Sequence, residues 1–270
     1  MNRDTFSREL QQSPVDLLRA GLLFSREIAY PALDVAAHER ALDGIADDAR
    51  QALSAAAAPP VALAHYLFGE ARFRGNSAAY GDPRNSYINE VLQRRLGIPI
   101  SLSVVYIAVA RRVGIAAYGV GLPGHFVVGA REGADEILLD PFHEGRRLTL
   151  ADCERLVRET TGHEGALEPS WLQPAPEHSI LARMLNNLRM IYVQREQWDK
   201  ALAVIEHLRQ VQPEVPEHLR DLGLIHYQQD EFYPAAHYLE SYLEQAPESP
   251  EATAIRQNLS VSFGRWARLN

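Results

Sequence analysis

The stretch GLPGHFVVGAREGADEILLDPF, residues 121–142, contains two apolar runs separated by a short polar turn. Runs rich in Val, Ile, Leu and Phe on either side of a glycine-containing turn are typical of a β-hairpin. We place the turn between Arg131 and Ala134, which sets His125 directly opposite Asp140. Directly opposite residues have Cβ atoms roughly 5 Å apart on one face of the sheet. The hairpin therefore predicts a His–Asp pair, and a register error of one residue would separate the two side chains.

A paired histidine and aspartate have two interpretations. The Asp140 carboxylate can accept a ring N–H of His125, which fixes the tautomer and leaves the other ring nitrogen free to act as a base. The same pair can also do no more than satisfy two polar groups of a sheet. A catalytic role needs a third residue, a nucleophile within hydrogen-bond reach of the histidine.

Two residues are candidate nucleophiles. The run IPISLSVVYIAVARRVG, residues 98–114, predicts a helix that Ser101 caps at its N-terminus. A side chain at that position is close to the positive end of the helix dipole, which favours a nucleophile or an oxyanion. Cys153, the single cysteine, lies inside a later helix for which Thr149 and Asp152 predict a capping box. We interpret Cys153 as a small buried apolar residue and Ser101 first of all as a helix cap.

A second candidate site lies in the loop between residues 73 and 98, which is rich in Gly, Asn, Asp and Ser. Arg84, Asn85, Ser86 and Tyr87 could present hydrogen-bond donors to a carboxylate or phosphate. Alternatively, their side chains hold the loop together. The sequence has no phosphate-binding glycine loop, no dinucleotide fingerprint, and no paired cysteines or HExxH run. We therefore expect no cofactor and no metal.

The C-terminal third contains an internal repeat of 34 residues. Residues of similar character recur at this offset in pairs: Leu188 and Leu222, Ile191 and Ile225, Trp198 and Phe232, Ala201 and Ala235, Pro213 and Pro247. This period, with a small residue early in the second helix and a closing proline, is the tetratricopeptide repeat (TPR) pattern. Each unit is a helical hairpin that must stack on its neighbours to bury its apolar face. Two units and a final capping helix are expected.

Composition limits the classes of function. The chain has 270 residues, 46% hydrophobic and 23% charged, with a formal net charge of −8. An acidic protein of this kind lacks the broad basic surface that binds nucleic acids or anionic membranes. One cysteine allows no intramolecular disulfide, and neither a signal peptide nor a membrane-spanning apolar run is evident. We expect a cytoplasmic protein that binds no nucleic acid and no membrane.

These patterns predict an α+β protein in two parts. Residues 1–165 form the first domain, of which residues 1–72 are mostly helical and the remainder contains a small antiparallel sheet. Residues 166–179 form a proline-containing linker, and residues 180–270 form the repeats.

The segments FRGN, YGDPRNSYINEVLQRRLGIPISLSVVYIAVARRVGI, GVGLPGHFVV and LLDPF together carry a family resemblance. They resemble the transglutaminase-like domain of a bacterial family whose members join it to C-terminal TPRs and are often described as SirB-type regulators. Transglutaminase-like enzymes are similar to papain-type proteases. They place a cysteine at the N-terminus of a helix and a histidine and an aspartate on neighbouring strands. The resemblance implies that His125 and Asp140 match this pair and that the nucleophile falls at or next to Ser101.

The chain departs from that enzyme pattern because it has no cysteine near Ser101. A thiol at a helix N-terminus ionises easily, whereas a serine hydroxyl needs a general base and an oxyanion hole. We therefore expect a non-catalytic, protein-binding or regulatory protein, a pseudoenzyme whose TPR surface binds a protein or peptide. The alternative is a Ser-His-Asp hydrolase of an amide or ester bond that uses Ser101, His125 and Asp140.

Overall fold

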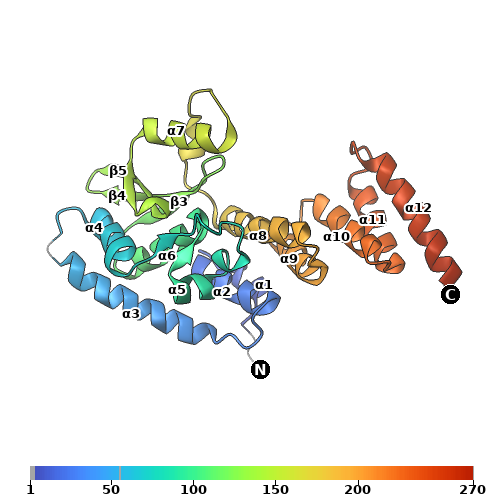
Figure 1. Ribbon diagram of the computed structural model, residues 1–270, viewed down its shortest axis with the longest axis horizontal. Helices are drawn as coiled ribbons and strands as arrows, with labels where there is room; N and C mark the ends of the chain where they lie inside the picture. The colour runs from blue at the N-terminus through green and yellow to red at the C-terminus, as the bar shows by residue number, and fades with distance from the viewer. Residues whose placement is uncertain (1–3, 55, 270) are drawn as a thin grey trace. The chain divides into compact units, whose positions relative to one another are not determined.

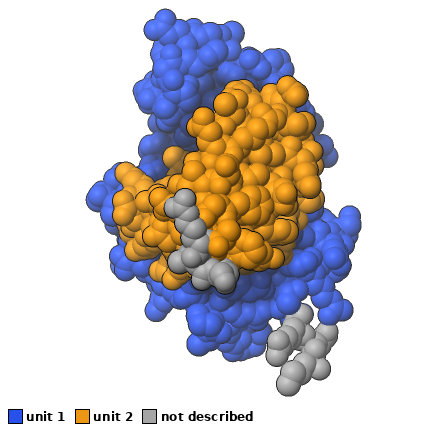
Figure 2. All heavy atoms as spheres, turned by 90° about the vertical axis from the view of Figure 1, so that its right-hand side faces the viewer, with its two compact units in different colours: residues 1–187 blue, residues 188–270 orange. Residues whose placement is uncertain are grey.

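The computed structural model describes residues 4–54 and 56–269, and the chain divides into two compact units. Residues 1–187 form the first unit and residues 188–270 the second (Figure 2). The division falls inside one helix, α8 (Glu177–Gln194). In the described ranges, no helix combines the length and the apolar character needed to cross a lipid bilayer.

The first unit begins with helices and continues with two short strands (Figure 1). Its N-terminal elements are α1 (Phe6–Glu9), α2 (Leu17–Ile28), α3 (Val35–Leu53), α4 (Pro59–His65), the π-helical turn η1 (Tyr66–Glu70), β1 (Arg74–Gly75), the 3-10 turn η2 (Pro83–Asn85), α5 (Ile88–Arg94) and β2 (Leu96–Gly97). The strands β1 and β2 pair in parallel and bring the loop between them back to the start of the next helix.

That next helix, α6 (Pro99–Arg112), is the core of the first unit. Eleven of its fourteen residues are buried, and it contacts α2, α3 and α5 as well as strands β3 (Ala117–Val120) and β4 (Val127–Glu132). A helix that is apolar all round must be covered on every side. The predicted N-cap at Ser101 is corrected by three positions, to Ile98. The helix begins at Pro99, since proline is favourable at a first helical position, and Ile98 is the N-cap.

A four-stranded antiparallel sheet with the order β3-β4-β5-β6 packs beside α6. It adds β5 (Asp135–Asp140) and β6 (Arg146–Leu148), separated by the 3-10 turn η3 (Pro141–His143). The unit is completed by α7 (Leu150–Thr161), the 3-10 turn η4 (Pro169–Leu172) and the start of α8. Thr149 and Asp152 form the predicted capping box of α7. The α+β class is confirmed.

The register of the hairpin differs from the prediction. The turn consists of Gly133 and Ala134, and Glu132 pairs with Asp135. Gly133 has a φ of +63°, a conformation that glycine adopts without strain and that two-residue hairpin turns require. The extrapolated ladder sets Asp140 opposite Val127 rather than His125. His125 precedes Val127 by two residues and is therefore a diagonal neighbour of Asp140.

The second unit consists of helices that repeat every 34 residues. After the end of α8 at Gln194 it contains α9 (Trp198–Val211), α10 (Glu217–Gln228), α11 (Phe232–Gln245) and α12 (Ala252–Leu269). Both ends of α11 are offset from those of α9 by this period, and α10 ends one period after α8. The turns that connect the helices follow the same period, because Glu196 and Asp230, which are 34 residues apart, both have a positive φ. The predicted repeat is therefore visible in the backbone itself.

Gly223 allows α10 and α11 to approach closely. A Cβ atom at this position would lie 2.6 Å from Leu239 Cδ2 and 3.1 Å from the Leu239 backbone nitrogen. We predict that Gly223→Ala lowers the free energy of unfolding by about 1–3 kcal/mol, the usual cost of overpacking. Chemical denaturation followed by circular dichroism measures this change.

The control is Gly264→Ala in α12, where an added Cβ would meet nothing within 4 Å. Alanine is the better helix former by about 1 kcal/mol, so this variant should be as stable as the wild type or more stable. Equal effects of the two substitutions would contradict a close approach of α10 and α11 at Gly223.

Candidate functional site

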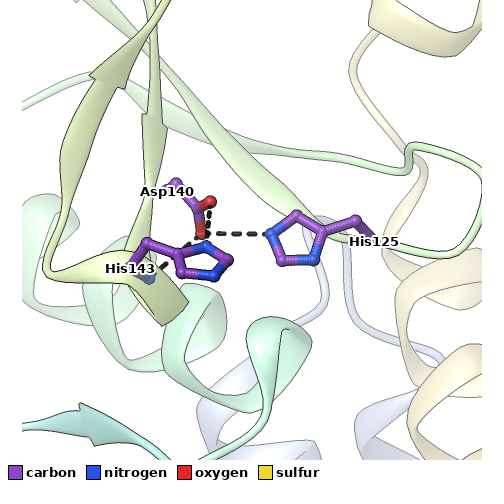
Figure 3. A group of neighbouring side chains, drawn as sticks. All are labelled: His125, Asp140 and His143. Atoms are coloured by element: carbon purple, nitrogen blue, oxygen red, sulfur yellow. Dashed lines mark hydrogen bonds and ion pairs between the residues drawn. The ribbon is translucent and has the colours of Figure 1, made fainter. Parts of the chain in front are cut away.

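His125 and Asp140 meet in the first unit (Figure 3). The His125 Nε2–H donates to Asp140 Oδ1 at 3.1 Å, and both side chains are buried, Asp140 completely. Asp140 ends β5, while His125 follows the turn that precedes β4. The contact fixes one ring nitrogen of His125 and leaves Nδ1 without a hydrogen-bond partner among the described residues. The structure thus brings together two of the three residues of the predicted triad.

His143 is a second histidine on the same carboxylate, and the sequence analysis did not identify it. Its Nδ1–H donates to Asp140 Oδ2 at 2.7 Å, and the side chain is 46% exposed. The backbone N–H groups of Phe142 and His143 donate to Asp140 Oδ1. Burial by itself raises the pKa of Asp140, but the hydrogen bonds from His125 and His143 outweigh it and hold the pKa below its usual value.

A small cavity of about 160 Å³ adjoins His125. Pro99 and Ile100, at the start of α6, line it together with His125 and Arg183 of α8. This is the place where the resemblance expects a nucleophile, next to the histidine and at a helix N-terminus. None of the residues that line the cavity is a serine, threonine or cysteine.

Ser101 lies one turn inside α6 and is completely buried. Its hydroxyl donates to the backbone oxygen of Asn85 at 2.6 Å and accepts the N–H of Ile98 at 3.1 Å. These contacts join the helix start to the preceding loop. The structure does not bring Ser101 into hydrogen-bond contact with His125, so Ser101 has the geometry of a capping residue.

Cys153 lies in α7 and is fully buried in an apolar cluster with Val127, Leu148 and Leu156. Burial raises the pKa of its thiol to about 11. A thiol of this kind is neutral at physiological pH and a poor nucleophile. The interpretation of Cys153 as a buried apolar residue agrees with these surroundings.

The loop residues proposed to bind an anion have separate surroundings. Arg84 is exposed and forms an ion pair with Asp82, whereas Asn85 is buried and donates to the backbone oxygens of Ala79 and Tyr80. The buried Ser86 is adjacent to Tyr87, whose ring contacts those of Phe24 and Tyr30 in the core. These contacts stabilise the loop and attach it to α2. The four side chains do not line a common cavity.

Among the residues that the structure describes, His125, Asp140 and His143 form a group that could ligate a metal ion. One ligand atom from each lies within 4.8 Å of the others. Two imidazoles and a carboxylate are ligands that zinc accepts. Both carboxylate oxygens already accept hydrogen bonds, however, and a cation would have to displace the imidazole N–H groups.

The second unit contains a groove of about 740 Å³ between the helices α8, α9 and α10. Met190 and Val193 of α8 line it and are 67% and 40% exposed. Leu224 and Ile225 of α10 line it as well. An exposed apolar surface inside a groove is typical of a binding site.

Sequence reasoning could have found His143 but not Arg183. His143 stands three residues after Asp140 in the turn DPFH, a spacing at which an aspartate and a histidine can meet. Arg183 donates to the backbone oxygen of His125, 58 residues away in the chain. No pattern within either segment indicates this contact, because it depends on where α8 packs.

Comparisons with known proteins agree with the two units. Residues 36–186 match the model of the transglutaminase-like superfamily, and residues 188–260 match a tetratricopeptide repeat model. A UPF0162 protein of Xylella fastidiosa (strain Temecula1) is 36% identical over 252 residues, which cover 90% of this chain and 88% of that protein.

Two further relatives match less of this chain. A UPF0162 protein of Vibrio cholerae is 28% identical and covers 74% of each chain. The F-box only protein 21 of Mus musculus is 38% identical over 137 residues, which cover 47% of this chain and 21% of that protein.

The structural role of Ser101 leads to a prediction. Ser101→Ala leaves the Ile98 N–H and the Asn85 carbonyl without their buried partner. We expect the free energy of unfolding to fall by about 1–3 kcal/mol, the desolvation cost of an unpaired buried group. Urea denaturation of the wild type and the variant measures the difference.

A fluorophosphonate probe distinguishes a cap from a nucleophile. We expect no labelling of Ser101 in the folded protein, because its hydroxyl is buried and already hydrogen-bonded. Stoichiometric labelling at Ser101, together with unchanged stability of Ser101→Ala, would contradict the structural role.

The lowered pKa of Asp140 leads to a dependence of stability on pH. The folded-state pKa lies below the unfolded value of about 3.9, so the ionised carboxylate stabilises the fold above that pH. We expect this contribution to disappear as the pH falls through the folded-state pKa. The stability difference between the wild type and Asp140→Asn should therefore shrink in acid.

Thermal unfolding at a series of acidic pH values measures this difference. Asp135→Asn is the control, because Asp135 is exposed at the start of the same strand. It should follow the acid profile of the wild type. A stability difference for Asp140→Asn that does not vary with pH would contradict the assignment.

Proposed function

We propose that this chain, which belongs to the transglutaminase-like superfamily and to the UPF0162 proteins, is a non-catalytic protein-binding protein. Among the described residues, no cysteine, serine or threonine lines the cavity beside His125, so the cavity lacks the usual nucleophiles. The first unit keeps the His125–Asp140 pair as a structural element. The second unit binds a peptide segment of a partner protein. A regulatory role of the SirB type would be exercised through this binding.

The observation that carries the proposal is the groove of the second unit. Its lining combines exposed apolar side chains, Met190 and Val193, with the aromatic ring of Trp198. A groove of about 740 Å³ falls in the size range of binding sites for small organic groups and peptide side chains. Burial of apolar anchors in such a groove is the usual source of affinity for a peptide.

Polar groups at the groove would orient a bound peptide. Arg189 and Asp221 form an ion pair of 2.8 Å at the groove, and Gln194 and Gln228 add amide groups. Amides and a paired charge can bond a peptide backbone, which gives orientation rather than affinity. The groove therefore suits a short segment with at least one large apolar side chain.

The loss of catalysis is supported by three separate features of the first unit. Ser101 donates its hydroxyl proton to Asn85, Cys153 is a neutral thiol in an apolar cluster, and proline and isoleucine line the cavity at the start of α6. Nothing specific in the geometry favours the Ser-His-Asp hydrolase, which needs Ser101 to reach His125.

A matched pair of variants tests the binding function. Val193 lies in the groove and Val261 lies in α12 outside it, and the two side chains are 40% and 41% exposed. We expect Val193→Glu to weaken binding of peptides selected from a display library against the wild type by about tenfold or more, since it places a charge on an apolar anchor surface. Fluorescence anisotropy of labelled peptides measures the affinity.

Val261→Glu serves as the control and should leave the affinity of the same peptides unchanged. Circular dichroism should show that both variants fold. The proposal fails if no peptide is selected by the wild type, or if the two valine variants bind the selected peptides equally well.

A further inference from the structure

We propose that the cavity beside His125 binds a carboxylate group. This inference goes beyond the peptide-binding groove, because every residue that lines the cavity belongs to the first unit. The cavity has a volume of about 160 Å³, equivalent to about five water molecules at the share of volume that water takes in the liquid. It admits a carboxylate with a short carbon stem and little more.

The main feature of the cavity is Arg183, a cation without an acidic partner. Its Nη2 donates to the backbone oxygens of Leu122 at 2.9 Å and His125 at 2.6 Å, and its guanidinium lies 5.4 Å from the centre of the Phe126 ring. In the described part of the chain, no carboxylate lies within ion-pair distance of it. Burial lowers the pKa of Arg183 from its usual value, a sign that the protein withdraws the charge from water without balancing it.

Two other half-buried arginines are paired. Arg189, six residues further along the same helix, forms an ion pair with Asp221 at 2.8 Å, and Arg19 forms ion pairs with Asp4 and Glu39. Burying a charge without a partner is costly. The two backbone hydrogen bonds use only Nη2, so Nη1 and Nε of Arg183 remain as donors for a ligand. Arg183 is thus a cation beside an open cavity, with no carboxylate partner in the described part of the chain.

The other polar groups of the cavity complement an anion. His125 lines the cavity as well, with its Nε2–H committed to Asp140, and it is not counted among the donors. Tyr80 contributes a hydroxyl, and Asn187 contributes an amide. The first turn of α6, at Pro99 and Ile100, adds the positive end of a helix dipole. These donors converge from separate segments of the first unit.

The charge and shape of this set favour a carboxylate. A guanidinium presents its N–H groups in a planar fork that matches the two oxygens of a carboxylate. One cation with otherwise uncharged donors balances a monoanion rather than a phosphate dianion. Ile98 and Phe126 provide apolar walls for a carbon stem. A free short-chain carboxylate and the C-terminal carboxylate of a peptide share this chemistry.

Binding of propionate to the full-length protein tests the proposal. The probe is titrated into protein with labelled histidine, and the ring signals of His125 are followed by NMR. We expect saturable shifts with propionate and none with propionamide, its neutral analogue. Arg183→Gln should weaken propionate binding by about tenfold or more, because it removes a charge-assisted pair of hydrogen bonds.

Arg158→Gln, at an exposed position in α7, is the control and should bind propionate like the wild type. Since Arg183→Gln also removes two hydrogen bonds to the backbone, a second variant guards against a folding defect. Tyr80 is 51% exposed, and Tyr80→Phe removes only its hydroxyl, so this variant should fold and bind about threefold more weakly.

Several outcomes would overturn the proposal. These are the absence of saturable binding, equal binding of propionate and propionamide, unchanged affinity in both Arg183→Gln and Tyr80→Phe, and tighter binding of inorganic phosphate than of propionate. A tripeptide with a free C-terminus and its amidated form then distinguish the two sources. Binding of the free-acid peptide alone assigns a chain terminus, and binding of propionate without either peptide assigns a small free carboxylate. Failure of peptide binding in the TPR groove affects none of these measurements.

Discussion

The buried carboxylate of Asp140 is the interaction on which the first unit depends. It ends β5, caps the 3-10 turn that follows, and receives imidazole N–H groups from two histidines, one of them from the turn that precedes β4. A charge withdrawn from water is tolerated only when several donors surround it. Removing any of these segments would take away some of the donors to this carboxylate, so the sheet, the turn and His125 support one another. Asp140 thus links the sheet, the 3-10 turn and the segment that carries His125.

The start of α6 is the place where the family resemblance expects a nucleophile. Beside His125, the same cavity is lined by the first residues of the helix, where proline supplies a favourable backbone and no reactive atom. The hydroxyl that lies closest in sequence to the start of α6 is that of Ser101, and it donates to the backbone oxygen of Asn85 in the preceding loop. Local stability and catalysis require opposite states of such a hydroxyl, since a nucleophile must be free to lose its proton. In this chain the hydroxyl proton of Ser101 is held by the backbone oxygen of Asn85.

The two units offer surfaces of different chemistry. The groove of the second unit exposes apolar side chains such as Met190, and burial of these supplies affinity without chemical selectivity. The cavity of the first unit is small and polar, and it contains the unbalanced charge of Arg183. Such a site supplies selectivity, because a ligand without a carboxylate leaves the guanidinium unpaired. The two proposals together would give the chain a broad protein-binding surface and a specific anion site.

Local sequence patterns determined much of the secondary structure of this protein. The alternation of apolar runs and turn residues predicted the hairpin, the 34-residue period predicted the helices from Trp198 onward, and Thr149 with Asp152 predicted the start of α7. These features depend on neighbours in the chain, so they can be read from it. The hairpin register required the backbone angle of Gly133, which the residue type permits but does not specify. The partners of Ser101 and Arg183 were decided only by the tertiary structure, because a polar group pairs with whatever distant segment packing brings to it.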